Sequence, residues 1–240
     1  MNIEDYARRH KHYWSDSFNN KELGTILDSR KFARLIDVGC GDGILLYQLN
    51  RMGYLDGVEE VWAVDLSSER LKDISLISPK IRPFQSDAQH LDGVPDSSFD
   101  LVISTQVIEH VENDFEMMKS LYRIARPGAI VYLDTVFKER YGYYFYKNDR
   151  GQRVLDPTHQ REYTDTYELI EKARAANFEI LQSSMNGFRF SPLNFVFRLI
   201  RVDNRWLSGS FALRTLQRIK VPIIGYKCWK IVLRKPPRAA

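Results

Sequence analysis

Short apolar runs alternate with helical stretches over the first three quarters of the chain. Five runs rich in β-branched and other apolar residues predict strands at 34–38, 60–65, 81–85, 99–104 and 129–134. Helical periodicity separates them at 44–52, 67–77 and 112–125. Strands alternating with helices of this length favour parallel βαβ units, and therefore an α/β sheet with helices on both faces.

The pattern changes after residue 137. Residues 138–162 are aromatic and polar without a clear period, and are too long for a plain connector. An amphipathic helix is predicted over 164–176 and a strand from 178, followed by basic, aromatic helical stretches over 189–220. Residues 225–233 alternate like a final, antiparallel strand. We expect one domain over 1–240, with a helical cap (1–32), a substrate-side loop (137–162) and a basic aromatic helical insertion (189–222).

Composition is that of a folded soluble protein, with 44% hydrophobic and 28% charged residues in 240. The N-terminus is too charged for a signal peptide, and arginines interrupt the best apolar stretch. The two cysteines, Cys40 and Cys228, are far apart in sequence and predict reduced thiols rather than a disulfide framework. A cytoplasmic location follows as the expectation.

The charge is unevenly distributed. Arg189 to Arg238 contains twelve Lys or Arg against the single Asp203, a net of +11, so the remainder carries −7 of the total +4. A basic end on an acidic body indicates an anionic partner on that side.

The sharpest motif is LIDVGCGDG at residues 35–43. Glycines at a strand-to-helix turn let the backbone approach a ligand closely. The spacing is G-x-G-x-G rather than the G-x-G-x-x-G of dinucleotide sites, which disfavours an NAD-dependent oxidoreductase. Asp37, two residues before the first glycine, would repel a pyrophosphate but suits a ligand with an ammonium group.

Polar residues also end three further strands. Asp65 closes the second strand, where a carboxylate can accept both hydroxyls of a ribose. Asp87 follows the third strand, placed for an exocyclic amine such as that of adenine, and Ser104 and Gln106 end the fourth. The carboxyl ends of parallel strands form the ligand-binding edge of open α/β sheets. Each acid alone could equally be a helix cap or a solvated loop residue.

These motifs resemble the class I S-adenosylmethionine-dependent methyltransferases, most closely the small-molecule group that includes ubiquinone and menaquinone methyltransferases. The matching segments are LIDVGCGDG (35–43), VWAVDLS (61–67), QSDAQHL (85–91), FDLVISTQVIEHVEN (99–113), RPGAIVYL (126–133) and HQREYTDTYELIEKARAANFEIL (159–181). The resemblance implies a Rossmann-like seven-stranded sheet of order 3-2-1-4-5-7-6 with strand 7 antiparallel. It also implies that S-adenosylmethionine binds and leaves as S-adenosylhomocysteine. The cofactor-binding residues expected are Asp37, Gly39, Cys40, Gly41, Asp65, Leu66, Asp87, Ala88, Ser104 and Gln106.

Two histidines are candidates for the base that a hydroxyl acceptor would need. His110 follows the fourth strand, and could equally be a packing or capping residue. His159 precedes a predicted helix, where Asp156 or Glu162 could orient its ring; a loop-fixing hydrogen bond is the alternative. Tyr143, in the aromatic segment 141–146, is the third catalytic candidate, on a segment that could line an acceptor pocket. No cluster with metal-ligand spacing is present in the sequence, so no metal is expected.

Residues 189–238 interleave aromatic and aliphatic side chains with arginine. This pattern fits a helix lying at the surface of an anionic membrane, and equally an apolar face that covers the sheet edge or a dimer interface. If the helix lies at a membrane surface, we expect the protein to contact the inner membrane surface peripherally. Nucleic acid is a less favoured partner, because the rest of the chain is acidic. The oligomeric state, monomer or dimer, is left open.

The sequence therefore predicts a methyltransferase for a small-molecule acceptor, with a hydroxyl of a glycan, lipid-linked or quinone-like compound favoured. Methylation of tRNA or protein is the alternative enzyme function, and would predict a steep dependence on salt. A non-catalytic cofactor-binding partner subunit would need a degraded glycine turn, which the sequence does not have.

Overall fold

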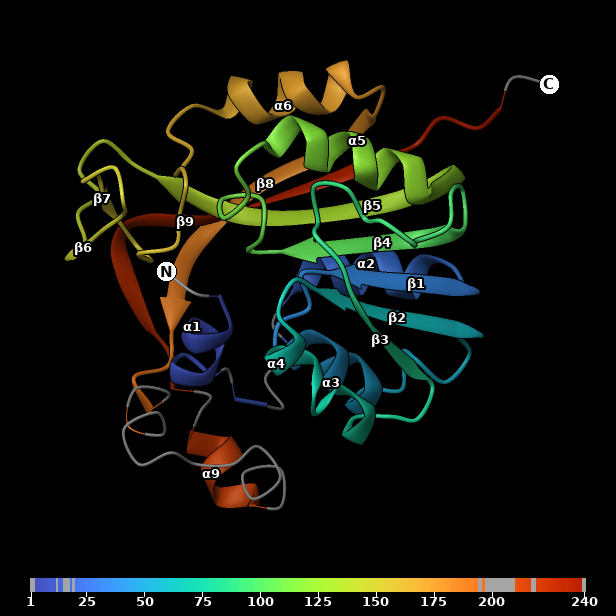
Figure 1. Cartoon of the computed structure of the whole chain (residues 1–240), viewed down its shortest axis with the longest axis horizontal. Coiled ribbons are helices and arrows are strands. Elements are labelled where there is room, and N and C mark those ends of the chain that lie inside the picture. The colour runs from blue at the N-terminus through green and yellow to red at the C-terminus, as the bar shows by residue number, and fades with distance from the viewer. Residues whose placement is uncertain are drawn as a thin grey trace. The chain divides into compact units, whose positions relative to one another are not determined.

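The computed structural model describes residues 3–11, 13–14, 18, 20–193, 196, 210–216 and 219–238 (Figure 1). The chain divides into two compact units. The first unit consists of Met1–Ser86 and Arg189–Val221, and the second consists of Asp87–Phe188 and Pro222–Ala240.

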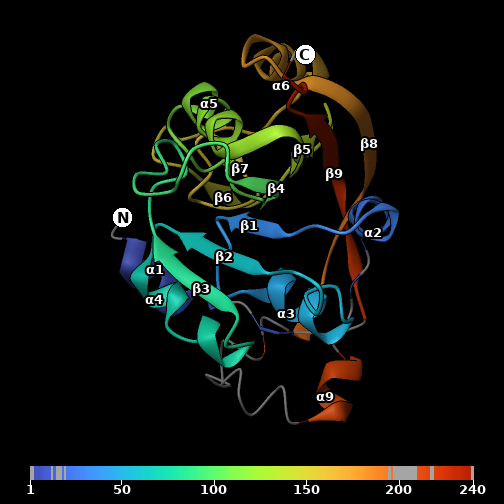
Figure 2. The ribbon, with the colours of Figure 1, turned by 90° about the vertical axis from the view of Figure 1, so that its right-hand side faces the viewer.

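Three parallel strands form the centre of the first unit. They are β1 (Arg34–Val38), β2 (Glu60–Asp65) and β3 (Ile81–Gln85), with β2 paired to both neighbours (Figure 2). The interiors of β1 and β2 are buried. Continuous apolar runs of this kind are typical of parallel strands that are covered on both faces.

The helices of the first unit are short: α1 (Ile3–Arg9), α2 (Lys21–Ser29), α3 (Ile44–Arg51), α4 (Ser68–Leu71) and the 3₁₀ helix η1 (Ile74–Leu76). A serine directly before a helix is a typical N-cap, and Ser67 caps α4 in this way. Its hydroxyl oxygen accepts a hydrogen bond from the backbone amide of Arg70. The prediction of one helix over 67–77 was wrong in its length. Ile74 and Ile77 in the second half pack against Gly43, and tertiary packing overrides local helix propensity.

The second unit contains the remaining main strands. β4 (Phe99–Thr105) pairs in parallel with β5 (Ala125–Lys138), and β5 pairs antiparallel with β9 (Val221–Arg234). β8 (Glu179–Phe190) lies next to β9. β5 is longer than the predicted 129–134, because its pairing with β9 continues to Lys138.

The seven main strands have the order β3-β2-β1-β4-β5-β9-β8. With β8 and β9 as the sixth and seventh of these strands, this is the order expected from the resemblance, and the antiparallel direction of the last strand is confirmed. Strands β6 (Tyr146–Lys147) and β7 (Arg153–Val154) form a separate two-stranded sheet. The aperiodic stretch at 138–162 thus contains a small hairpin.

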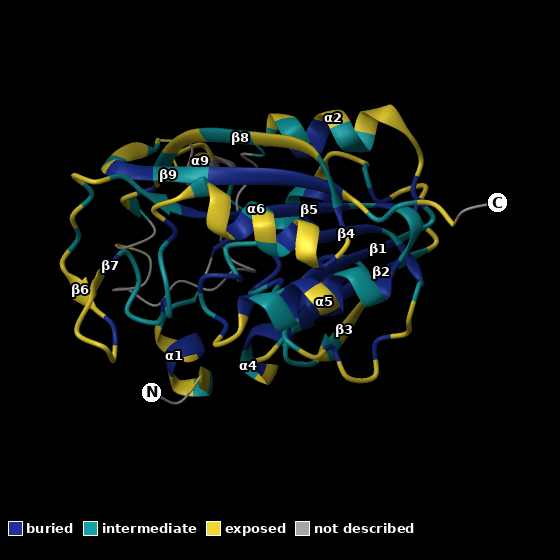
Figure 3. Cartoon of the chain, turned by 90° about the horizontal axis from the view of Figure 1, so that it is seen from above, coloured by how far each residue is buried: buried dark blue, intermediate teal, exposed yellow. Residues whose placement is uncertain are grey.

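Two helices of the second unit lie over β4 and β5 (Figure 1): α5 (Asp114–Ile124) and α6 (Thr166–Ala175). Their N-caps, Asn113 and Asp165, both accept backbone amide hydrogens with their side chains. Figure 3 shows long buried stretches of β5 and β9 in dark blue and exposed turns of α6 in yellow. The buried strands thus form the core of this unit.

The predicted insertion at 189–222 is described only in part. β8 extends to Phe190 and β9 begins at Val221, and α9 (Phe211–Leu216) lies between them. Residues 197–209 lie outside the described residues, so the structure does not test the proposed membrane-surface helix. In the part of the chain that is described, no helix combines the length and the apolar character needed to cross a membrane.

Candidate active site

The glycine turn after β1 belongs to the first unit and has the predicted left-handed backbone. Gly39 has a φ of 76° and Gly41 a φ of 55°, values that residues with a Cβ rarely adopt. Cys40 lies between them, buried, and its burial raises the pKa of the thiol well above its usual value. The turn therefore depends on its glycines for its conformation rather than on a reactive cysteine.

The amides of this turn are bonded within the protein. Gly39 and Cys40 both donate to the carbonyl oxygen of Val64, at 2.7 and 2.9 Å, and Gly41 donates to Oδ2 of Asp65 at 2.9 Å. A phosphate-binding loop instead directs its backbone amides at the ligand. This geometry agrees with the spacing argument against a dinucleotide.

Asp37, at the carboxyl end of β1, has a buried carboxylate that the protein leaves unsatisfied. Its side chain is 1% exposed, and neither oxygen has a hydrogen-bond partner among the described residues. Burial, and then the neighbouring charge of Asp65, raise the pKa of Asp37 to about 7. An unpaired buried carboxylate is costly, so this group calls for a cationic or hydrogen-bond-donating ligand.

Asp65 ends β2 and fixes two backbone segments at once. Besides Gly41, it accepts a hydrogen bond from the amide of Ser67 at 2.9 Å. Burial raises its pKa, and these two hydrogen bonds act in the opposite direction. Each oxygen keeps a second lone pair that can accept a hydroxyl hydrogen. The next predicted residue, Leu66, has an exposed side chain.

The N-terminal segment contacts the glycine turn after β1 and the start of α4 after β2. The Trp14 indole donates to the carbonyl oxygen of Asp42 at 2.6 Å. Glu4 accepts hydrogen bonds at the start of α4, from the Ser67 hydroxyl at 2.6 Å and the Ser68 amide at 2.9 Å. The predicted role of residues 1–32 as a cap over the cofactor stays a prediction.

Asp87 and Ala88 belong to the second unit. The Asp87 carboxylate accepts from the backbone amide of Gln89 at 2.8 Å and from its side-chain amide at 3.1 Å. This is the local turn that an aspartate forms with its own chain. Ala88 is buried. The roles of both residues toward adenine stay predictions.

The end of β4 is strained at a predicted residue. Gln106 has a φ of 56°, which is uncommon outside glycine, and its amide donates to the Asp134 carbonyl oxygen at 2.8 Å. Its side-chain amide donates to the Asp134 carboxylate. Ser104, two residues earlier, is fully buried. Strain held by paired hydrogen bonds is typical of functional sites.

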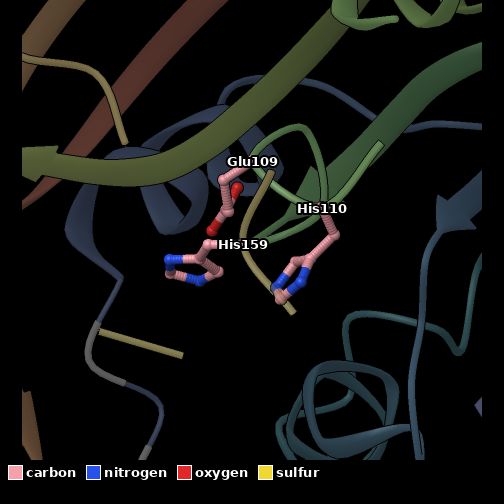
Figure 4. A group of neighbouring side chains, drawn as sticks. All are labelled: Glu109, His110 and His159. Carbon is pink, nitrogen blue, oxygen red and sulfur yellow. The ribbon is translucent and has the colours of Figure 1, made fainter. Parts of the chain in front are cut away.

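The two candidate histidines lie together, with a carboxylate that the sequence analysis did not select. The rings of His110 and His159 are 4.7 Å apart between centroids, and the carboxylate of Glu109 points toward His159 (Figure 4). Glu109 and His159 are buried. Burial raises the pKa of Glu109 to about 7.

Each imidazole is oriented through its Nδ1. The His159 Nδ1 lies 3.0 Å from Oε1 of Glu162, so of the two acids expected beside this ring it is Glu162 that contacts it. Burial alone would lower the pKa of His159, but this carboxylate and its neighbours raise it overall. The His110 Nδ1 lies 2.8 Å from the hydroxyl of Thr158, which in turn donates to Asp156. Asp156 therefore acts on His110, through Thr158.

Tyr143 lies elsewhere in the second unit, in the segment between β5 and β6. It is 56% exposed, and the guanidinium of Arg153 lies over its ring at 4.6 Å. Its predicted catalytic role, and the pocket predicted for the aromatic segment, stay predictions.

The sequence of residues 36–133 matches the family model described as "Methyltransferase domain". The matched region runs from β1 to β5 and includes the glycine turn, Asp65 and Glu109. This part of the chain is a methyltransferase domain.

Curated relatives of this methyltransferase carry a consistent name. Ubiquinone biosynthesis O-methyltransferase of Psychrobacter cryohalolentis is 27% identical over 200 residues, covering 80% of this chain and 73% of the relative. The enzyme of the same name from Cupriavidus pinatubonensis is 24% identical over 217 residues, covering 83% and 84%. The similarity thus extends beyond the matched domain into the second half of the chain.

Solved structures show the same fold at lower identity. The [4+2]-cyclase SpnF has a TM-score of 0.63 at 21% identity, covering 95% of this methyltransferase and 88% of the cyclase. A putative methyltransferase from Bacillus halodurans also has a TM-score of 0.63, at 17% identity, covering 90% and 98%. Because one neighbour is named as a cyclase, the acceptor chemistry has to be argued from side chains rather than from the fold.

Sequence reasoning missed Glu109 and Thr158 in this methyltransferase. A signal for Glu109 exists, since it stands between Ile108 and the candidate His110, shortly after β4 ends at Thr105. No comparable signal marks Thr158, because its contact with His110 joins residues 48 positions apart.

Proposed function

We propose that this methyltransferase transfers the methyl group of S-adenosylmethionine to a hydroxyl oxygen on a small molecule with a quinone-like ring. The observation that carries the choice of oxygen is the cluster of Glu109, His110 and His159, in which Glu109 and His159 are buried and the two imidazoles are held at Nδ1. The names of the relatives support the class of ring.

The first unit fits the cofactor at its amino-acid end. The carboxylate of Asp37 is buried and lacks a partner among the described residues, and an ammonium group would supply both charge and hydrogens. Gly39 and Gly41 leave space that a Cβ would occupy in an L-residue turn. When bound, S-adenosylmethionine supplies an electrophilic methyl carbon, and its sulfur keeps the electron pair of the broken bond.

Asp65 would hold the ribose. Its two oxygens already accept from Gly41 and Ser67, so the carboxylate is fixed before any ligand arrives. Preorganised acceptors lose little conformational freedom on binding. In this proposal Asp37 and Asp65 orient the cofactor, and much of the rate enhancement comes from alignment, worth up to about 7–11 kcal/mol in well-oriented systems.

The acceptor requires the removal of a proton. A phenolic hydroxyl has a pKa of about 10 in water, as in tyrosine, so it is mostly protonated at neutral pH. The sequence predicted His159 or His110 as its base, and a positioned base contributes about 10²–10⁴-fold. The cluster supports this prediction because Glu162 and Thr158 hold the rings in fixed orientations.

Glycans and lipid-linked compounds are the other acceptors that the sequence predicts, and the experiment below distinguishes them from phenols. A glycan or lipid-linked hydroxyl would need the same deprotonation. The predicted pocket at residues 141–146 would favour an aromatic ring over a sugar, since exposed aromatic side chains there can stack on it. The predicted membrane contact of residues 189–238 would serve an acceptor with a lipid tail.

The test has two stages. Calorimetry measures binding of S-adenosylmethionine and S-adenosylhomocysteine to the full chain, with the Asp37→Asn variant as the comparison. A panel of acceptors is then incubated with methyl-labelled cofactor: catechols and other phenols with and without a prenyl tail, sugars, aliphatic amines, tRNA and protein. Labelling of phenols at oxygen is expected. Labelling confined to amines, tRNA or protein, or no cofactor binding, would overturn the proposal.

A further inference from the structure

Glu109, in the cluster with His110 and His159, has a carboxylate oxygen that its described neighbours do not use. Oε2 of Glu109 accepts from the Thr135 hydroxyl at 2.8 Å, while Oε1 is buried and has no partner in the described chain. The residue is 0% exposed. A buried carboxylate oxygen left in this state points to a ligand that donates hydrogen or carries positive charge.

The contacts at Thr158 fix the tautomer of His110. The Thr158 hydroxyl lies 2.6 Å from the Asp156 carboxylate and 2.8 Å from the His110 Nδ1. A hydroxyl has a single hydrogen and a carboxylate can only accept, so Thr158 donates to Asp156. It must then accept from an Nδ1–H of His110. The neutral His110 ring therefore has its lone pair on Nε2.

Glu162 fixes His159 in the same way. Its Oε1 accepts from the His159 Nδ1–H at 3.0 Å, and the side chains of both residues are almost fully buried, at 3% and 4% exposed. The neutral ring thus also has its lone pair on Nε2. A carboxylate behind the Nδ1 of a histidine is the arrangement that orients imidazole ligands in metal sites.

We propose that Glu109, His110 and His159 bind one divalent transition-metal ion, through Oε1 of the glutamate and Nε2 of each histidine. One ligand atom from each of the three side chains lies within 4.8 Å of the others (Figure 4). In tetrahedral coordination, two metal–ligand bonds of about 2.1 Å place their ligand atoms about 3.4 Å apart. A pair that lies 4.8 Å apart therefore closes by about 1.4 Å when the ion binds.

The donor set favours zinc-like ions over magnesium. Two of its three donors are imidazole nitrogens, which suit Zn²⁺, Co²⁺ and Fe²⁺, whereas Mg²⁺ prefers oxygen ligands in an octahedral shell. Three protein ligands leave at least one position for another ligand, as in catalytic rather than structural zinc sites. The sequence could not reveal the site, because His159 is far from Glu109 and His110 along the chain.

Such an ion would deepen the proposed function, and this consequence rests on it. The hydroxyl oxygen of the acceptor would occupy the open position, and its O–H bond would break with the proton passing to water. The oxygen then forms the new bond to the methyl carbon, while the carbon–sulfur bond breaks and leaves its electron pair on sulfur. With the ion bound, the two histidines would act as its ligands and water would take the proton, whereas in the protein without metal a histidine keeps the role of base.

The test measures metal binding without cofactor or acceptor. Chelator-treated full chain is titrated at pH 8, with Zn²⁺ by calorimetry and with Co²⁺ by visible absorption. One ion per chain with micromolar or tighter affinity is expected, with Mg²⁺ at least about 100-fold weaker. Co²⁺ should give the spectrum of a site with mixed nitrogen and oxygen ligands.

Variants assign the ligands. Glu109→Gln and His159→Ala should each weaken binding by at least about 10-fold, and Glu162→Gln should do so through the ring it orients. His90→Ala is the matched control, since His90 is an exposed histidine of the same unit. Thr158→Val serves as a second positioning variant if Glu109→Gln does not fold, as judged by thermal unfolding.

Two results would overturn the inference: binding no tighter than millimolar, or binding that survives the Glu109 and His159 substitutions. Calorimetry with S-adenosylmethionine is done on the same preparation. Cofactor binding with phenol methylation in metal-free protein would remove the metal site and leave the proposed function standing. Metal binding without cofactor binding would overturn the proposed function and leave the metal site standing.

Discussion

Asp65 accepts a hydrogen bond from the amide of Gly41, at 2.9 Å, although 24 positions separate them. The end of β2 thereby holds the turn that follows β1, and the same carboxylate also holds the amide of Ser67. The conformation of the glycine turn is thus maintained by a residue predicted to bind the ribose. A substitution at Asp65 is therefore expected to disturb both the backbone of the glycine turn and the binding of the ribose.

Replacement of Asp65 should therefore weaken cofactor binding in two ways. Asp65→Ala removes the acceptor of two backbone amides and of the ribose hydroxyls, and we expect affinity for S-adenosylhomocysteine to fall by about 10–100-fold, as for the loss of one charge-assisted hydrogen bond. Asp65→Asn keeps an amide oxygen and should lose less. Calorimetry on both variants measures the difference, and equal affinities in wild type and Asp65→Ala would contradict the assignment.

Cofactor affinity should depend on pH through Asp37. Its pKa is raised to about 7, and the ionised form is the one that binds an ammonium group. Affinity for S-adenosylmethionine should rise with pH up to about 7 and level off above it, with a slope of up to about tenfold per unit below that pH. Asp37→Asn should bind weakly with a flat profile. A wild-type profile that is flat between pH 5.5 and 8 would refute this prediction.

The same group predicts the direction in which stability changes with pH. The pKa of Asp37 is higher in the folded than in the unfolded chain, so the folded state binds more protons between about pH 4 and 7. The free energy of unfolding should therefore fall as pH rises through that window. Asp37→Asn should reduce this fall only in part, because the pKa of Glu109 is raised in the same way. Urea unfolding at pH 5 and 8 provides the comparison.

Loss of His159 should affect turnover more than cofactor binding. His159→Ala removes an imidazole of the cluster, and we expect kcat to fall by about 10²–10⁴-fold with the affinity for S-adenosylhomocysteine nearly unchanged. His90→Ala is again the control and should retain wild-type turnover. Wild-type kcat in His159→Ala with cofactor bound would remove the residue from the mechanism.

Gly43 should matter for packing rather than for the ligand. Its φ is 77°, and a Cβ added there would lie 2.6 Å from the Cδ1 atoms of both Ile74 and Ile77. Gly43→Ala should lower the free energy of unfolding by about 1–3 kcal/mol, as overpacking does. At Gly57 an added Cβ meets no atom within 4 Å, so Gly57→Ala should change stability by less than about 0.5 kcal/mol. Denaturant unfolding of the pair measures the contrast.

The sequence by itself determined the main strands and the glycine turn, whereas the order of the strands came from the resemblance to a known family. Apolar runs separated by helical periods specify parallel strands, and the motif at 35–43 marks where the first one ends. These features are local, because strand and turn preferences act over a few neighbouring residues. It also indicated His110 and His159 as candidates, and Asp156 or Glu162 as the acid beside the His159 ring, since each lies close to a strand end or helix start.

Only the tertiary structure decided which side chains meet. Glu109 is next to His110 in sequence, yet its relation to His159 depends on how the segment before α6 returns to the end of β4. Both oxygens of Asp37 and Oε1 of Glu109 lack a hydrogen-bond partner among the described residues. The sequence cannot show this, because burial depends on every element packed around these groups. Long-range packing, which has no sequence period, therefore sets the protonation and ligand-binding properties of the site.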